Sequence, residues 1–254
     1  MFDLNLFQKN LSTDSIGRAI QYYPELDSTN TKAWELITKN AINGTVVITD
    51  NQLKGRGRQS NKWISTPSEN LTFSIILYPN YQLNQINHYS LIPGLAITDC
   101  LIGYDFQARL KWPNDILING KKVGGILCES KISGQLIQSM VIGIGLNVNI
   151  QKTDFPPVLQ NATSLFIENG ERYQLEILLA NICNYLEYRL KNVNTANSQL
   201  LVWENRCAHL NQTVTFHFDN QIINGTFKGL SPTGQARMLI DNKEFCFNSG
   251  ELFD

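Results

Sequence analysis

Apolar residues recur along this chain in short dense runs and in longer runs at helical spacing. Residues 45–49, TVVIT, and 71–78, LTFSIILY, are rich in β-branched and aromatic residues and predict buried strands. Asn119-Gly120 is a hairpin signal between two further extended runs. The same pattern predicts strands over residues 20–26, 108–112, 116–118, 121–129 and 136–148. The first 26 residues are expected to be a short lead-in with one strand.

Three stretches predict helices. Ser28 and Thr29 are favourable N-cap residues and predict a helix over residues 30–39, so capping alone would explain them. Residues 91–103 carry apolar positions at helical spacing, and Pro93 is expected in the first turn, where proline is tolerated. Residues 175–190 predict an amphipathic helix of about four turns.

The chain changes character near residue 198. Residues 192–198, NVNTANS, predict a polar linker that divides a domain at 1–198 from a domain at 199–254. A short helix is expected over 203–210. Four short strands are predicted over residues 213–218, 222–229, 236–240 and 244–247. Turns are expected at Asp219-Asn220, Ser231–Gly234 and Asp241-Asn242. Together they predict a small antiparallel barrel.

The stretch from Gln52 to Trp63, QLKGRGRQSNKW, interrupts this pattern between two predicted core strands. It has no apolar period, and two glycines alternate with Arg56 and Arg58. Arginine presents a fork of donors that suits phosphate or carboxylate, and glycine lets the backbone approach a ligand. Two interpretations stay open from these residues alone: an arm that folds over an anion, or a solvated basic loop.

Paired glycines also interrupt the predicted strand over residues 136–148. Gly143 and Gly145 lie two residues apart and therefore on one face of it. Such glycines allow a ligand or a neighbouring backbone to approach closely, and tight packing or a bulge explains them equally well.

Composition excludes several classes of protein. The chain has 254 residues, 43% hydrophobic and 17% charged, so it can bury a core and is not disordered. Its formal net charge of −1 argues against bulk binding to DNA or RNA. The five cysteines show no metal-binding spacing, and we expect reduced thiols in a cytoplasmic protein. The N-terminus lacks a signal-peptide pattern, and no apolar run is long enough to span a membrane.

Taken together, the motifs resemble those of biotin protein ligases. They are, in order, Asp27–Asn30 (DSTN), Gln52 with Gly55–Arg58 (GRGR) and Trp63, Lys111–Asp115 (KWPND), Gly120–Leu127 (GKKVGGIL), Gly143–Asn149 (GIGLNVN) and Ser249–Glu251 (SGE). The resemblance implies an α+β fold with a central mixed β-sheet flanked by helices, of the class II synthetase-like biotin/lipoate ligase type. It also implies a C-terminal SH3-like β-barrel, and the chain resembles the shorter form without an N-terminal DNA-binding domain.

The resemblance implies a two-step reaction. Biotin would attack the α-phosphate of ATP, with Mg²⁺, to give biotinyl-5′-AMP. A lysine of a biotin carboxyl carrier domain would then take the biotinyl group. Neither step needs a serine, cysteine or histidine nucleophile, because positioning and charge stabilisation suffice. We expect a cytoplasmic monomer or weak homodimer whose partner is a biotin-dependent carboxylase, with neither DNA nor a membrane as a partner.

Site residues are carried over by motif position. The implied biotin-binding residues are Ser28, Thr29, Asn30, Gln52, Arg56, Gly57, Arg58, Lys122 and Gly125. The implied ATP- or adenylate-binding residues are Arg56, Arg58, Trp63, Lys111, Asn114 and Asn147. The implied catalytic residues are Lys122, Arg56, Arg58 and Asp115, and no protein-bound metal is expected. Asp115 would orient the carrier lysine or help to hold Mg²⁺. Outside the motif, Lys122 would be read as a routine solvated charge.

One departure from the family pattern concerns the arm. Many bacterial members continue GRGR with a further basic, glycine-containing run, whereas this chain has Gln59-Ser60-Asn61. That departure bears on how tightly the arm retains the adenylate. We expect the arm, residues 53–61, to be mobile without ligand and to order on binding.

Three competing functions are considered. A lipoate or octanoate ligase would share the fold but not the pairing of GRGR with KWPND. A non-enzymatic biotin sensor or repressor would need a DNA-binding module. An RNA-binding protein using the Gly-Arg loop would need an aromatic-rich basic surface, which this composition does not indicate.

Overall fold

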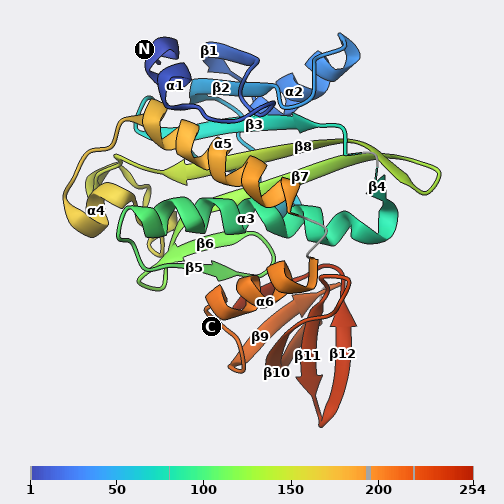
Figure 1. Cartoon of the computed structure of the whole chain (residues 1–254). Coiled ribbons are helices and arrows are strands. Elements are labelled where there is room, and N and C mark those ends of the chain that lie inside the picture. The colour runs from blue at the N-terminus through green and yellow to red at the C-terminus, as the bar shows by residue number, and fades with distance from the viewer. Residues whose placement is uncertain (1, 80, 193–195, 220, 254) are drawn as a thin grey trace.

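The computed structural model describes residues 2–79, 81–192, 196–219 and 221–253, and within them two sheets are seen (Figure 1). The larger has eight strands in the order β1-β2-β3-β8-β7-β6-β5, with β4 paired to β8. Only β1 and β2 pair in parallel, so the sheet is mixed. The strands are β1 Ile20–Leu26, β2 Val46–Gln52, β3 Asn70–Leu77, β4 Tyr81–Gln82, β5 Ala108–Lys111, β6 Asp115–Ile118, β7 Lys121–Ser133 and β8 Leu136–Asn147.

Helices cover both faces of this sheet. They are α1 Leu4–Asn10, α2 Thr29–Thr38, α3 Ile86–Gly103, α4 Leu165–Asn169, α5 Leu175–Lys191 and α6 Ala196–Arg206. Alternation along β2 sends Val46 to the large core that contains α3 and α5, and Val47 to a smaller core with Ala33 of α2. The predicted central mixed sheet flanked by helices is therefore confirmed.

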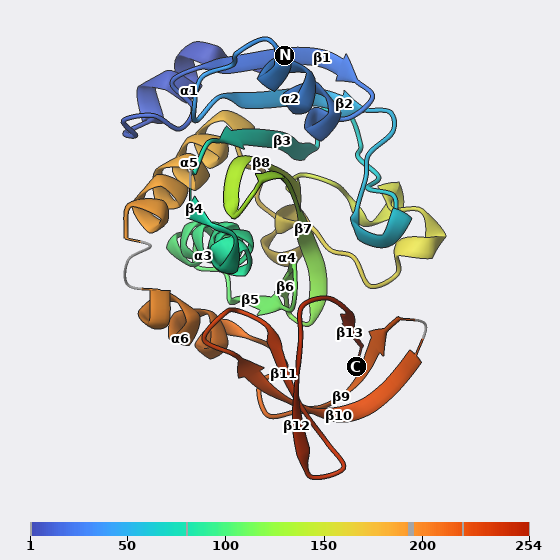
Figure 2. The ribbon, with the colours of Figure 1, turned by 90° about the vertical axis from the view of Figure 1, so that its right-hand side faces the viewer.

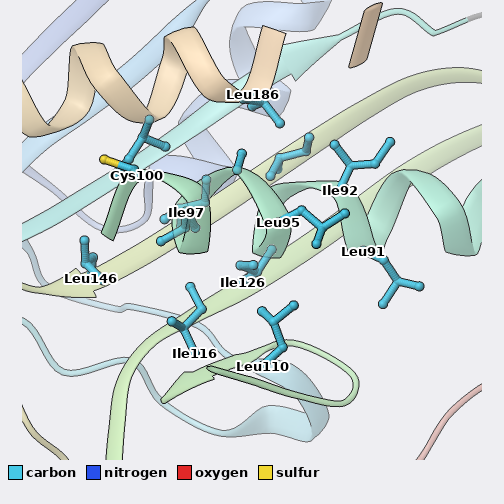
Figure 3. Close-up of a cluster of buried hydrophobic side chains, with 14 of the residues drawn as sticks. Leu91, Ile92, Leu95, Ile97, Cys100, Leu110, Ile116, Ile126, Leu146 and Leu186 are labelled. Atoms are coloured by element: carbon cyan, nitrogen blue, oxygen red, sulfur yellow. The ribbon is translucent and has the colours of Figure 1, made fainter. Parts of the chain in front are cut away.

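Helix α3 lies inside the large core, beside α5 and against strands β5 to β8 of the sheet (Figure 3). Leu95 and Ile97, among others, are buried on it, and Leu186 of α5 and Leu146 of β8 face it from opposite sides. Because α3 begins at Ile86, Pro93 sits in the interior of the helix, and its predicted place in the first turn is wrong. Because α3 is buried on all sides, its packing outweighs the free energy that an interior proline usually costs a helix.

The N-terminal lead-in also differs from the prediction. Helix α1 was not predicted, because its seven residues bury only Phe7. Its start does carry a signal: the Asp3 side chain accepts hydrogen bonds from the N–H groups of Asn5 and Leu6. Strand β1 lies where it was predicted.

The second sheet is antiparallel and five-stranded within the described residues, in the order β12-β11-β10-β9-β13 (Figure 2). Its strands are β9 Thr213–Phe218, β10 Gln221–Leu230, β11 Ala236–Ile240, β12 Lys243–Phe247 and β13 Glu251–Phe253. The arrangement agrees with the predicted SH3-like barrel. Trp112 packs on Phe216 of β9, with ring centroids 6.0 Å apart, and so joins the two sheets.

The junction between the sheets departs from the predicted linker. Helix α6 spans residues 196–206, so the short helix predicted over 203–210 begins and ends too late. Residues 193–195 of the predicted linker lie outside the described residues, as does Asn220 of one predicted turn. The division at residue 198 stays a prediction.

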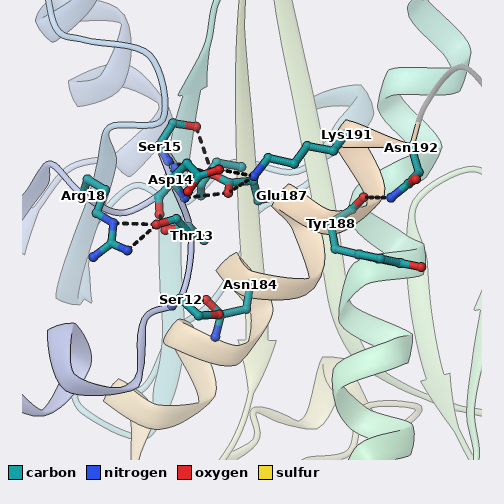
Figure 4. A network of polar contacts seen from close by, with 11 residues as sticks. Ser12, Thr13, Asp14, Ser15, Arg18, Asn184, Glu187, Tyr188, Lys191 and Asn192 are labelled. Atoms are coloured by element: carbon teal, nitrogen blue, oxygen red, sulfur yellow. Dashed lines mark hydrogen bonds and ion pairs between the residues drawn. The ribbon is translucent and has the colours of Figure 1, made fainter.

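Glu187 of α5 ties the helix to the N-terminal segment (Figure 4). Its carboxylate is 8% exposed and accepts hydrogen bonds from the N–H groups of Asp14, Ser15 and Ile16 at 2.6, 2.8 and 3.0 Å. Burial by itself raises the pKa of Glu187, but these donors and Lys191 outweigh it and lower the pKa to about 2.

Replacing Glu187 with Gln is expected to lower the free energy of unfolding at pH 7 by about 3 kcal/mol. Because the pKa is lower in the folded state, this stability is present above about pH 4.5 and is lost as the pH falls toward 2. Urea denaturation of the parent and of Glu187→Gln between pH 2.5 and 7 would measure the free energy of unfolding at each pH. Glu25→Gln, at an exposed position, is the control. An unchanged pH slope in Glu187→Gln would contradict the assignment.

Candidate active site

A cleft of about 100 Å³ opens to solvent where the start of α2, the stretch after β2 and strands β3, β6, β7 and β8 meet. It brings together most of the residues predicted from the motifs. These are Ser28, Thr29, Asn30, Gln52, Arg56, Gly57, Arg58, Trp63, Asn114, Asp115, Lys122 and Gly125. Residues more than 90 positions apart in the chain thus form one polar wall.

The start of α2 forms one end of the cleft. Ser28 is the N-cap residue, and its hydroxyl accepts from the N–H of Thr31 at 3.5 Å. The N–H of Thr29 donates to Gln52 Oε1 at 2.8 Å. Ser74 Oγ lies 2.6 Å from Asn30 Oδ1 and 2.7 Å from Thr29 Oγ1. Capping and site formation are therefore done by the same residues.

The paired glycines of β8 make room for side chains of this chain. A Cβ atom at Gly143 would lie 2.1 Å from Asn30 Oδ1, and one at Gly145 would lie 2.3 Å from the ring of Trp63. Both distances are far below any real contact, so only glycine fits. The structure thus supports the close-packing interpretation for both positions.

The stretch 52–63, which contains the arm, folds back on itself as a short hairpin. The N–H of Gly57 donates to Asn61 O at 2.7 Å, and the N–H of Trp63 donates to Gly55 O at 3.1 Å. Arg58 Nη1 donates to Gly250 O at 3.3 Å, which links the arm to the segment before β13. Burial lowers the pKa of Arg58, and the charge of Glu251 acts against that effect. Ordering of the arm on ligand binding stays a prediction.

Two cations of the cleft are held by carboxylates. Lys122 Nζ lies 2.6 Å from Asp115 Oδ1, and Arg56 Nη1 lies 3.0 Å from Glu129 Oε1. Gly125 lies beside this pair, and a Cβ atom there would be 3.5 Å from Lys122 Nζ, an ordinary contact distance. Sequence reasoning missed Glu129, although alternation along β7 places it on the same face as Gly125.

Two predicted site residues do not line the cleft. Lys111 Nζ lies 5.3 Å from the centre of the Phe253 ring. Asn147 is buried, accepts from Asn70 Nδ2 at 2.9 Å and donates to Thr163 O at 3.0 Å. Their roles toward the adenylate stay predictions.

Two buried polar atoms at the cleft lack a hydrogen-bond partner within the described part of the chain. They are Trp63 Nε1 and Thr72 Oγ1, and both residues line the cleft. Such atoms are costly to bury unless a ligand or water satisfies them. Thr72 was not predicted, although polar residues at 70, 72 and 74 on one face of an apolar strand were a usable signal.

Comparison with known proteins shows the family to which the chain belongs. Residues 22–147 match the biotin/lipoate A/B protein ligase family. The bifunctional ligase/repressor BirA of Bacillus subtilis is 34% identical over 240 residues, which cover 92% of this chain and 73% of that protein. The chain belongs to the biotin/lipoate A/B protein ligase family. It is a ligase, and it resembles the biotin protein ligases among them, as its motifs predicted.

Two further relatives bear on the site of this ligase. The biotin–[acetyl-CoA-carboxylase] ligase of Paracoccus denitrificans is 36% identical over 126 residues, 48% of this chain and 51% of that protein. The structure of the biotin protein ligase from Aquifex aeolicus in complex with biotin and ATP superposes with a TM-score of 0.80 at 29% identity. It covers 92% of this chain and 97% of that one.

The described residues also bear on membranes and metals. Among them, no helix is long and apolar enough to cross a membrane. Nor do they contain a group of three or more His, Cys, Asp or Glu side chains placed to hold a metal ion.

Proposed function

We propose that this ligase activates biotin with ATP and transfers it to a lysine of a biotin carboxyl carrier domain in the cytoplasm. The observation that carries the proposal is the cleft itself, in which Arg56, Arg58 and Lys122 face a polar pocket formed by the start of α2 and Gln52. The Aquifex aeolicus relative, solved with biotin and ATP, supports both substrates. The Paracoccus denitrificans relative, a biotin–[acetyl-CoA-carboxylase] ligase, supports the carrier.

The first step would join the two substrates. A carboxylate oxygen of biotin attacks the α-phosphorus of ATP, an oxygen–phosphorus bond forms, and the bond to the β-phosphate breaks to release pyrophosphate. Negative charge gathers on the transferring phosphoryl group, and Lys122 with the arm arginines would stabilise it. The Lys122–Asp115 pair, at 2.6 Å, holds the ammonium in place before the substrates arrive.

The biotin head would lie against the network at the start of α2. A ureido group both donates and accepts hydrogen bonds, and hydroxyl and amide side chains match it. The contacts of Thr29 with Gln52 and of Asn30 with Ser74 fix these groups in advance. On the adenylate side, the unpartnered indole N–H of Trp63 would find an acceptor on the ligand. Asn114, Lys111 and Asn147 are proposed for the same side.

Mg²⁺ would enter with the phosphates of ATP. Magnesium keeps several waters and is commonly held by substrate phosphates with one or two carboxylates. Asp115 and Glu251 both line the cleft and would be the carboxylates that contact the ion. The ion would offset the charge of the phosphates.

The second step would transfer the biotinyl group. The carrier's lysine nitrogen attacks the acyl carbon of biotinyl-5′-AMP, the bond to the phosphate oxygen breaks, and AMP leaves as the amine loses a proton. Asp115 would orient that amine. We further propose a monomer or weak homodimer that needs neither DNA nor a membrane.

The test offers the protein three acids in turn. Incubated with ATP, Mg²⁺, biotin and a purified carrier domain, it should add one biotinyl mass to the carrier, read by intact mass spectrometry. Lipoate and octanoate, in the same assay, should add nothing. Transfer of lipoate or octanoate in place of biotin would confirm a ligase reaction but show that biotin is not the substrate. Transfer of none of the three acids would favour the non-enzymatic biotin sensor.

A further inference from the structure

Lys122 lies at an irregular place in the larger sheet. On one side β7 pairs with β6, and the register shifts between the pair of Leu117 with Lys122 and the pair of Ile116 with Gly124, so a β-bulge directly follows Lys122. On the other side, β8 pairs with β7 only from Gly124 onward. A bulge disrupts the ladder locally and redirects the side chains beside it. The neighbouring strands therefore do not by themselves fix the backbone of Lys122.

A segment outside the sheet, residues 161–163, takes the place of β8 beside Lys122. The N–H of Lys122 donates to Asn161 O at 2.9 Å, and the N–H of Thr163 donates to Lys122 O at 2.9 Å. The two segments thus form a parallel bridge. Thr163 is buried, and its own carbonyl accepts from Asn147 Nδ2 at 3.0 Å. This segment holds both backbone polar groups of Lys122, so the position of Lys122 depends on what holds residues 161–163.

Glu168 of α4 ties that segment to the turn before β7. Its Oε1 accepts from Thr163 Oγ1 and its Oε2 accepts from Asn119 Nδ2, each at 2.5 Å. Asn119 has a left-handed backbone, with a φ of 51°, in the turn that leads into β7. Hydrogen bonds to an ionised carboxylate are shorter and stronger than those between neutral groups. One carboxylate therefore holds both flanks of Lys122, the turn before it and the bridge beside it.

Helix α4 is itself a firm support for this carboxylate. Ser164 caps the helix by accepting from the N–H of Ile167 at 3.1 Å, and its hydroxyl donates to Ile150 O at 2.6 Å. Leu165, the next residue, is buried in the large core. Because the helix is fixed, Glu168 can set the position of the two groups that donate to it.

We propose that Glu168 is a positioning residue for Lys122. It does not line the cleft, and it acts through the turn and the bridge that place the backbone of Lys122. At the far end of the same side chain, the ammonium lies 2.6 Å from Asp115 Oδ1, so the backbone and the charged group are held separately. A misplacement of about 1 Å can cost about a hundredfold in rate. The inference rests on the proposed function for the reaction that Lys122 serves, whereas the contacts of Glu168 do not depend on it.

The first measurement is made without ligand. Exchange of the Lys122 amide hydrogen with solvent deuterium, followed by NMR, reports how firmly the bridge to Asn161 is held. Glu168→Ala should speed this exchange by about tenfold, because two hydrogen bonds that support the bridge are lost. Asn119→Gly breaks one of the two without touching α4, and glycine readily adopts the positive φ of the turn, so its exchange rate should lie in between. The matched control is Glu171→Ala, which removes an exposed carboxylate just after α4 and should leave the exchange rate unchanged.

The second measurement separates positioning from general damage to the fold. In biotin-dependent exchange of pyrophosphate into ATP, Glu168→Ala should lower kcat about thirtyfold and leave KM for biotin within about twofold of the parent value. In a Lys122→Ala background, the same change should alter the residual rate by less than about twofold, because the group through which Glu168 acts is gone.

An unchanged exchange rate of the Lys122 amide hydrogen in Glu168→Ala would overturn the positioning role. So would a loss of activity by the same factor in both backgrounds, or a raised KM for biotin with kcat unchanged. If the parent itself shows no biotin-dependent exchange of pyrophosphate, the proposed function falls. The exchange rate of the amide hydrogen then decides alone whether Glu168 positions Lys122.

Discussion

Lys122→Ala is expected to lower the rate of biotinyl-5′-AMP formation by about a thousandfold. The ammonium lies inside the cleft, and the Asp115 carboxylate 2.6 Å away fixes its position. A preorganised cation of this kind stabilises developing charge without reorganisation, so its loss falls on the chemical step. Biotin-dependent exchange of pyrophosphate into ATP would measure that step without the carrier.

The matched control is the next residue along β7. Lys121 has the same charge but is exposed, and alternation sends its side chain to the opposite face of the strand. Lys121→Ala should keep the parent rate. If the two variants lose activity equally, or if Lys122→Ala keeps its activity, the proposed role of Lys122 is wrong.

The sheet strands were predictable because their signals are local. The dense β-branched runs and the Asn119-Gly120 turn place β2, β3, β6 and β7 to within a few residues. The starts of helices were harder. Helix α3 begins at Ile86 with no side-chain cap. Helix α1 is capped by Asp3 but buries only one side chain, so its apolar pattern is too short to predict it. Strand β13 is three residues long, and only its pairing with β9 defines it.

Local sequence signals also predicted only part of the candidate site. The motifs found the residues that line the cleft, but not what holds them. The Glu129 carboxylate reaches Arg56 across 73 positions, and Ser74 reaches Asn30 across 44. No local pattern records such pairs. Asn147 is the opposite case. Its place in the motif predicts a site residue, but its amide is occupied by two buried hydrogen bonds that the motif does not indicate.

These pairs give the cleft a common electrostatic design. Lys122 and Arg56 each rest on a carboxylate, and the charge of Glu251 acts on Arg58. The ligand-free site therefore avoids concentrating like charges, which would otherwise repel one another. Anionic substrates can then pair with cations that are already oriented. Less of the binding free energy is therefore lost in ordering side chains.

Gly145→Ala is expected to lower kcat/KM for biotin by about a hundredfold, because a misplacement of about 1 Å in a positioning group can cost that much. The added Cβ would lie 2.3 Å from the Trp63 ring, whereas ordinary contact begins near 3.4 Å. The indole must withdraw from β8, and the end of the arm moves with it. The backbone of β8 pairs on both sides with β3 and β7, so the sheet is the firmer partner.

A matched glycine separates this effect from a general loss of stability. Gly103→Ala adds the same methyl group at the end of α3, where its nearest neighbour, Tyr185 Oη, would be 3.5 Å away, an ordinary contact. Gly103→Ala should therefore keep the parent activity, while Gly145→Ala should lose activity together with a shift in tryptophan fluorescence. Activity of Gly145→Ala within threefold of the parent would mean that the position of Trp63 on β8 does not govern the reaction, since so small a change is about 0.7 kcal/mol.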